Sequence, residues 1–127
     1  DRNKELQSDN LHETGGLSGR PLFNKSTSFL ALASKIIKIK KYNLYLIAAG
    51  GVSDYKSAYA KILCGAHLVQ LYSSMTFDGP LIAENILKGL LKLMNRDEIS
   101  SIKDIRGIVD NPEDAIKIAN NGLKDYL

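Results

Sequence analysis

Two short apolar runs, each ending at glycine or serine pairs, constrain the fold of this chain more than any other feature. Residues 44–49 are almost entirely apolar and stop at Gly50-Gly51, and residues 67–72 form a second run that stops at Ser73-Ser74. Short runs of this kind are typical of strands that are buried on both faces, as in a parallel sheet. We therefore expect these runs to be two neighbouring strands of a parallel sheet.

Helical patterns separate and flank the two expected strands. The apolar periodicity predicts three helices, at residues 26–41, 54–64 and 81–95. Ser26 or Thr27 can cap the first of these helices, and Ser53 can cap the second. Because helices and strands alternate with short connections, the sequence predicts an α/β fold in which parallel strands lie under a helical layer.

The last part of the chain, residues 96–127, departs from this alternation. Asn111 is a suitable N-cap, Pro112 suits the first helical position, and two acidic residues follow in the first turn. The helix that they begin carries an apolar face made of Ala115, Ile118, Ala119 and Leu123. We expect this tail to need another surface of the protein to pack against.

Composition and charge exclude several classes of function. The chain has 127 residues, of which 44% are apolar and 24% are charged, as in one small globular domain. Its 17 basic residues are spread along the chain and its net charge is +3, so no nucleic-acid-binding stripe is predicted. The longest apolar stretch, residues 44–52, is too short to cross a bilayer, so we expect this chain itself to be soluble.

Cysteine and histidine usage limits the chemistry further. Cys64 is the only cysteine, so no internal disulfide can form, and we expect its thiol to serve packing or to lie at the surface. Neither His12 nor His67 has further ligands at metal-binding spacing, so no metal site is predicted. The first residues are polar and do not begin with Met, so we expect no signal peptide and a segment of a longer protein.

The two strand ends are the best candidates for a binding site, because ligands of parallel α/β proteins bind beyond the carboxyl ends of the strands. Gly50-Gly51 lets the backbone approach a bulky anion closely, and the next helix presents free N–H groups. Tyr72, Ser73 and Ser74 add further N–H groups and hydroxyls. Together they resemble the phosphate site after strands 7 and 8 of β/α barrels. The alternatives are a tight turn without a ligand and a packing role for Tyr72.

A third motif, GGLSGRPL at residues 15–22, points to a particular family. The segments ETGGLSGRPL, LIAAGGVSDYKSAYAKILCGAHLVQLYSS and TFDGP resemble class 2, quinone-linked dihydroorotate dehydrogenases. The resemblance runs over residues 1–94 with a short continuation at 99–107. It implies the C-terminal part of a TIM (β/α)8 barrel, about its last two β/α units. It also implies a barrel segment at 1–107 followed by a helical extension at 108–127.

The resemblance implies FMN as the cofactor. By this match, the flavin nucleotide is contacted from the first loop and its phosphate is bound by backbone N–H groups at the two strand ends. The residues in these positions are Ser18 and Gly19 in the loop, Gly50 and Gly51 at the first strand end, and Tyr72 and Ser73 at the second. We expect Gly51→Val to weaken FMN binding, because a branched side chain would occupy the space of the phosphate.

The same resemblance implies that the catalytic groups lie outside this chain. The family removes a substrate proton with a serine base, holds orotate with asparagines and positions the flavin with a lysine and an Asn-Thr-Thr segment, all upstream. We therefore assign no catalytic residue here and expect no turnover by the chain alone. The complete enzyme would act on dihydroorotate and quinone, at the bacterial cytoplasmic membrane or the mitochondrial inner membrane.

Several alternatives stay open at this point. The chain belongs to a larger enzyme, comes from a split or decayed gene, or assembles with copies of itself or with the missing N-terminal part of the barrel. Two other functions are another phosphate-binding β/α-barrel enzyme and a non-catalytic remnant that only folds or self-associates. An open two-stranded sheet leaves edges that must be paired or covered, so a stable monomer of this piece would be unexpected.

Overall fold

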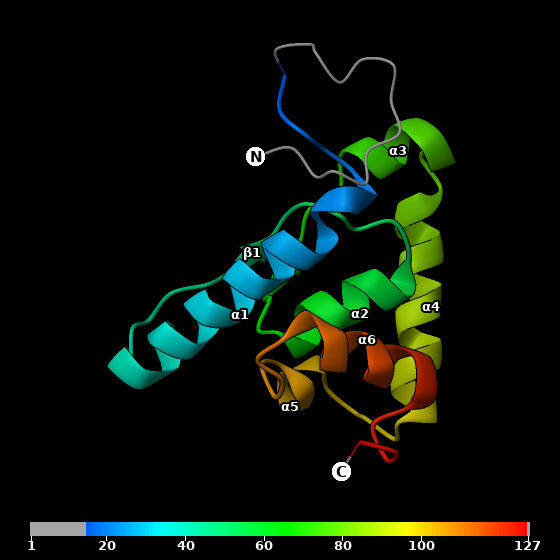
Figure 1. Cartoon of the computed structure of the whole chain (residues 1–127). Helices are drawn as coiled ribbons and strands as arrows, with labels where there is room; N and C mark the ends of the chain where they lie inside the picture. Colours follow the sequence, from blue (N-terminus) through cyan, green and yellow to red (C-terminus); the bar gives the residue numbers. More distant parts are fainter. Residues whose placement is uncertain (1–14, 127) are drawn as a thin grey trace.

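The computed structural model describes residues 15–126, and the loop expected at residues 1–14 lies outside the described residues. A short 3-10 segment, η1, opens the described part (Figure 1). The elements in chain order are η1 (Arg20–Leu22), α1 (Phe23–Lys40), β1 (Ile47–Ala48), α2 (Tyr55–Leu63), β2 (Leu68–Val69), α3 (Ser73–Asp78), α4 (Ile82–Arg96), α5 (Ile102–Ile105) and α6 (Pro112–Asn121).

The two predicted strands are present and pair in parallel, which confirms the α/β prediction. Ile47 lies opposite Leu68, and Ala48 lies opposite Val69. Both strands are shorter than the apolar runs that predicted them, because only the central part of each run pairs. The ladder is bounded by hydrogen bonds from His67 N to Leu46 O and from Gln70 N to Ala48 O, each of 2.8 Å.

Helix α1 begins three residues earlier than the sequence predicts. The 3-10 turn of Arg20–Leu22 leads directly into Phe23, so Ser26 lies inside the helix and the expected cap at Ser26 or Thr27 is wrong. The Thr27 hydroxyl instead donates to the carbonyl oxygen of Phe23, one turn back. The helix ends with Lys41 in the left-handed conformation (φ 55°).

The N-cap of α2 is Asp54, not the predicted Ser53. Asp54 has an extended backbone, and its Oδ1 accepts a hydrogen bond from the Ser57 N–H at 2.7 Å. In return, the Ser57 hydroxyl oxygen accepts from the Asp54 N–H at 3.0 Å. This reciprocal pair is a capping box, and it satisfies two N–H groups of the first turn.

We expect Asp54→Ala to lower the free energy of unfolding by about 1 kcal/mol, because the first turn of α2 loses its cap. The measurement is thermal unfolding followed by circular dichroism. Ser53→Ala is the matched control, since the Ser53 side chain takes no part in the capping box. Equal losses in the two variants would contradict this assignment of the cap.

Helix α2 is the centre of the core. Its residues Ala58, Tyr59, Ala60 and Leu63 are fully buried. Figure 1 shows α6 lying beside α2 and α4 running steeply past one end of α2, and both helices contact α2. Cys64, at the end of α2, is also buried, and burial raises the pKa of its thiol to about 11, so the thiol serves packing.

The predicted helix in the tail is confirmed. Asn111 caps α6, with its Oδ1 accepting from the Asp114 N–H at 2.8 Å, and Pro112 occupies the first position. The predicted apolar face is the buried face, since Ala115, Ile118 and Ala119 have no exposed surface. The tail packs mainly against α2 and also contacts α1.

Candidate functional site

The two strand ends lie at the same edge of the sheet because β1 and β2 run parallel. The Gly50-Gly51 turn follows β1, and Tyr72 and Ser73 follow β2 at this edge. The loop before α1 reaches the same place, because a Cβ atom built on Gly19 would lie 3.8 Å from Ser73 Cβ. The structure therefore brings together residues from three segments that the sequence analysis singled out.

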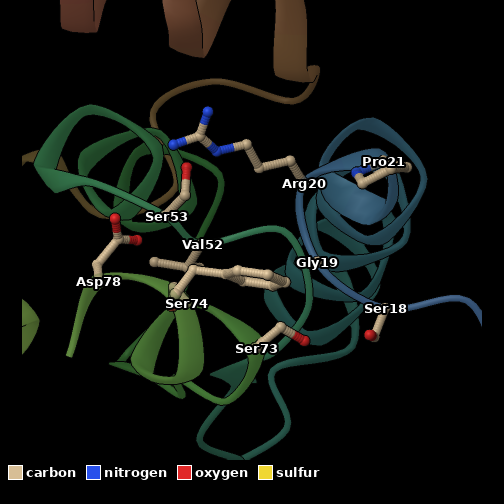
Figure 2. A pocket seen from close by; sticks show the side chains of 10 residues that line it. Ser18, Gly19, Arg20, Pro21, Val52, Ser53, Ser73, Ser74 and Asp78 are labelled. Atoms are coloured by element: carbon tan, nitrogen blue, oxygen red, sulfur yellow. The ribbon is translucent and has the colours of Figure 1, made fainter. Parts of the chain in front are cut away.

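A cavity of about 390 Å³ opens at this edge (Figure 2). Of the six predicted site residues, Ser18, Gly19 and Ser73 line it, whereas Gly50, Gly51 and Tyr72 do not. The Tyr72 side chain is 84% exposed. The full lining comprises Ser18, Gly19, Arg20, Pro21, Val52, Ser53, Ser73, Ser74, Phe77 and Asp78.

Helix α3 was not predicted, and it changes the second strand end. The chain turns at Tyr72 and begins a six-residue helix at Ser73, instead of continuing as an extended loop. This turn buries Ser74, whose Oγ has no hydrogen-bond partner among the described residues. A buried hydroxyl without a partner costs about 1–3 kcal/mol, so Ser74 is suited to receive a ligand atom.

The cavity is lined by polar groups of more than one kind. Arg20 contributes a guanidinium, which extends toward Ser53 in Figure 2. Asp78 contributes a carboxylate, and four serines contribute hydroxyls. Guanidinium and hydroxyl groups are common ligands of phosphate. Ser74 was named in the sequence at the second strand end, whereas Arg20 and Ser53 were not selected as site residues, although Arg20 stands inside the GGLSGRPL motif.

The Gly50-Gly51 turn requires glycine for a steric reason within the protein, in addition to the predicted approach of an anion. Both glycines have positive φ, 86° and 79°. A Cβ atom on Gly51 would lie 2.3 Å from the Cα atom of Phe23, at the start of α1. A side chain at Gly51 would therefore meet the backbone of Phe23, and the expected effect of Gly51→Val on FMN binding stays a prediction.

His67 has a structural environment. Its Nδ1 accepts a hydrogen bond from the Leu46 N–H at 3.1 Å, and its ring meets Tyr45 edge-to-face with centroids 5.0 Å apart. Burial, together with the nearby Arg106, lowers the pKa of His67. Within residues 15–126, no group of three or more His, Cys, Asp or Glu side chains is placed to hold a metal ion. No helix in this part of the chain is long and apolar enough to cross a membrane.

Comparison with known proteins points to one family. The family model described as dihydroorotate dehydrogenase matches residues 2–94. The chain is 48% identical over 94 residues to a dihydroorotate dehydrogenase (quinone) of Rhizobium johnstonii, covering 74% of this chain and 25% of the relative. It is 40% identical over 107 residues to the Natronomonas pharaonis protein of the same name, covering 84% of this chain and 29% of the relative.

Solved structures agree with the sequence comparison. A ligand-free DHODH from Eimeria tenella superposes with a TM-score of 0.75 at 36% sequence identity, covering 84% of this chain and 29% of that one. The chain thus spans between a quarter and a third of the length of the relatives that it matches. Helices α5 and α6 lie after the residues that the family model matches.

Proposed function

Because the chain belongs to the dihydroorotate dehydrogenase family, we propose that it forms part of the FMN-binding barrel of a quinone-dependent enzyme that oxidises dihydroorotate to orotate in pyrimidine biosynthesis. The observation that carries this proposal is the convergence of the GGLSGRPL loop with two parallel strand ends around one cavity that contains a guanidinium and several hydroxyl groups. This is the edge of a parallel sheet at which β/α barrels bind phosphate groups.

The cavity fits the phosphate end of FMN through its donors. Ser74 offers a buried hydroxyl without a partner among the described residues, and Arg20 adds a positive charge. We assign the holding of FMN to Ser18, Gly19 and Ser73 around the cavity, with Gly50, Gly51 and Tyr72 beside it. When bound, FMN supplies the flavin ring that accepts hydride from the substrate. The protein residues named here bind and orient the nucleotide.

We place the chain as about the last two β/α units of a (β/α)8 barrel. The sheet face supports this placement, because Ile47 is 59% exposed and Leu68 is 62% exposed although both belong to apolar strands. Barrel strands bury such side chains inside the barrel. One face of α1 is likewise exposed and apolar, with Phe29, Leu32, Ile36 and Ile39. The partner that would cover these surfaces is the remaining barrel or another copy of the chain.

The complete enzyme would then associate with the bacterial cytoplasmic membrane or the mitochondrial inner membrane and pass electrons to quinone. This proposal rests on the relatives named dihydroorotate dehydrogenase (quinone). Fractionation of cells that express the native protein tests it. Exclusive recovery of the protein in the cytosolic fraction at low and high salt would contradict it.

We expect the chain alone to show no dihydroorotate-dependent turnover. Within residues 15–126, no serine hydroxyl around the cavity is hydrogen-bonded to a histidine or a carboxylate that would activate it, although Asp78 lines the same cavity. The family places its serine base upstream of this segment. The measurement is reduction of a redox dye by dihydroorotate with FMN present, compared with FMN without protein. Dye reduction clearly above that blank would show that the chain contains its own proton-abstracting group.

A further inference from the structure

Lys61 is a buried cation close to the site, and nothing described so far requires it. It lies in α2, between the core residues Ala60 and Ile62, and its side chain has no exposed surface. Among residues 15–126, no carboxylate lies within 4 Å of its Nζ. Burial of a charge without a partner of opposite charge is costly, and such exceptions are concentrated at functional sites.

The contacts of Lys61 lead to the Gly50-Gly51 turn. Lys61 Nζ donates to Ser26 Oγ at 2.6 Å, and Ser26 Oγ donates to the carbonyl oxygen of Gly50 at 2.9 Å, with the carbonyl oxygen of Phe23 as a longer alternative acceptor at 3.2 Å. The ring of Phe23, whose backbone packs against Gly51, lies 5.2 Å from the same Nζ. The two residues that restrain the turn are therefore both in contact with Lys61.

Because the peptide group is planar, holding the Gly50 carbonyl oxygen in place also fixes the direction of the Gly51 N–H. The Gly50 carbonyl and the Gly51 N–H belong to one trans peptide, so they point in opposite directions. When Ser26 holds the carbonyl toward α1, the Gly51 N–H points away from α1. This N–H has no hydrogen-bond partner among the described residues, so it is available to an anion at the strand end.

We propose that Lys61 is a positioning residue for the phosphate of the flavin, which orients the Gly50-Gly51 peptide through Ser26 and places a positive charge behind it. This inference rests on the proposed function. Burial lowers the pKa of Lys61 to about 8, so the ammonium remains the main form at neutral pH. The phosphate would then be stabilised in two ways, by the aligned Gly51 N–H donor and by the Lys61 ammonium in a medium of low dielectric constant.

The test compares FMN with riboflavin, which lacks the phosphate, in equilibrium titrations of flavin fluorescence. Lys61→Met keeps an unbranched side chain that is one atom shorter and removes its charge. We expect it to weaken FMN binding roughly tenfold, which corresponds to about 1.4 kcal/mol, and to leave riboflavin affinity within about twofold. Ser26→Ala is the second variant, and we expect the same selective loss because the Gly50 carbonyl loses its donor.

Lys56→Met is the matched control, because Lys56 is another lysine of α2 whose Nζ donates to Asn120 Oδ1, on the side of α6. It removes the same charge, and we expect no change in FMN affinity. The unfolding temperature shows whether Lys61 positions the Gly50-Gly51 peptide or only stabilises the fold. We expect Lys61→Met not to lower it, since the variant removes a buried charge that has no carboxylate partner among the described residues. A lower unfolding temperature of Lys61→Met, together with an equal loss of affinity for FMN and for riboflavin, would overturn the proposal.

The resonance of the Gly51 amide in NMR spectra of the ligand-free chain tests the positioning role of Lys61 separately from the proposed flavin binding. If the unaltered chain binds neither flavin, the proposed function fails for this chain, and the Gly51 amide still reports on the turn. A shift of this resonance in both Lys61→Met and Ser26→Ala, but not in Lys56→Met, supports the positioning role. An unmoved Gly51 amide, or unchanged FMN affinity in Lys61→Met, overturns it.

Discussion

Gly51→Ala is expected to destabilise the ligand-free chain by more than about 3 kcal/mol, and Gly51→Val by at least as much. A Cβ atom at this position would lie 2.3 Å from Phe23 Cα and 2.4 Å from Phe23 N, so two backbone segments would have to separate. The positive φ of 79° adds strain for any residue with a side chain. The measurement is denaturant unfolding followed by circular dichroism.

The alanine variant distinguishes two explanations for this glycine. If Gly51 only kept space free for a phosphate, Ala would lower the stability of the flavin-free chain by no more than the strain of its positive φ. The contact with Phe23 predicts a larger loss of stability before any flavin is added. Gly79→Ala is the control, because Gly79 has nearly the same φ (78°) and a Cβ atom there has no neighbour within 4 Å. A stability of Gly51→Ala equal to that of Gly79→Ala would refute the packing explanation.

Asp97→Ala is expected to cost about 3–5 kcal/mol, because it removes one partner from a buried charged network. The Asp97 carboxylate is 2% exposed and lies 2.8 Å from Arg96 Nε. It also accepts from the hydroxyl of the buried Tyr59 at 2.8 Å and from the Leu123 N–H at 3.2 Å. Arg96 in turn donates to the carbonyl of Ile118 at 2.9 Å, so the network joins the ends of α4 and α6.

The control for Asp97→Ala is Glu98→Ala, which removes the neighbouring acid. Glu98 pairs with Lys124 at the surface, where such a pair contributes at most about 1 kcal/mol. Unfolding midpoints in urea would compare the two variants. A loss in Asp97→Ala no larger than that in Glu98→Ala would mean that the tail does not depend on this network.

The Asp97 carboxylate also makes the stability of the chain depend on pH. Burial alone would raise the pKa of Asp97, but hydrogen bonds from Arg96, Tyr59 and the Leu123 N–H outweigh it and lower the pKa below its usual value. The stabilisation is therefore present above the pKa of an unfolded aspartate, about 3.9, and is lost as pH falls through the folded pKa. We expect the stability difference between the unaltered chain and Asp97→Asn to shrink below about pH 4.

Local signals in the sequence predicted the fold where a few consecutive residues decide the structure. Asn111 and Pro112 define a helix start within one turn, and α6 begins where they predict. The two apolar runs predicted the parallel strands in the same way. The N-cap of α2 was misassigned by one residue, because both Ser53 and Asp54 are good caps and only the backbone conformation decides between them.

The remaining features depend on contacts between residues far apart in the chain. Gly51 needs to be glycine because of Phe23, which comes 28 positions earlier and touches it only after folding. Lys61 looks like an ordinary solvated lysine in the sequence, and its contacts with Ser26 and Phe23 of α1 form only when α1 packs against α2. The Ser74 hydroxyl, which has no hydrogen-bond partner among residues 15–126, likewise owes its burial to α3, which no apolar periodicity indicates.

The central claim is that the GGLSGRPL loop and the two strand ends form a flavin-phosphate site. The most direct measurement is a visible absorption spectrum of the purified chain after incubation with FMN and desalting, with riboflavin as the control ligand. We expect FMN to be retained in preference to riboflavin and Gly19→Val to reduce the retention, since its Cβ atom would face Ser73. Loss of FMN on desalting, with no flavin band above that of a protein that binds no flavin, would show that these segments form no such site.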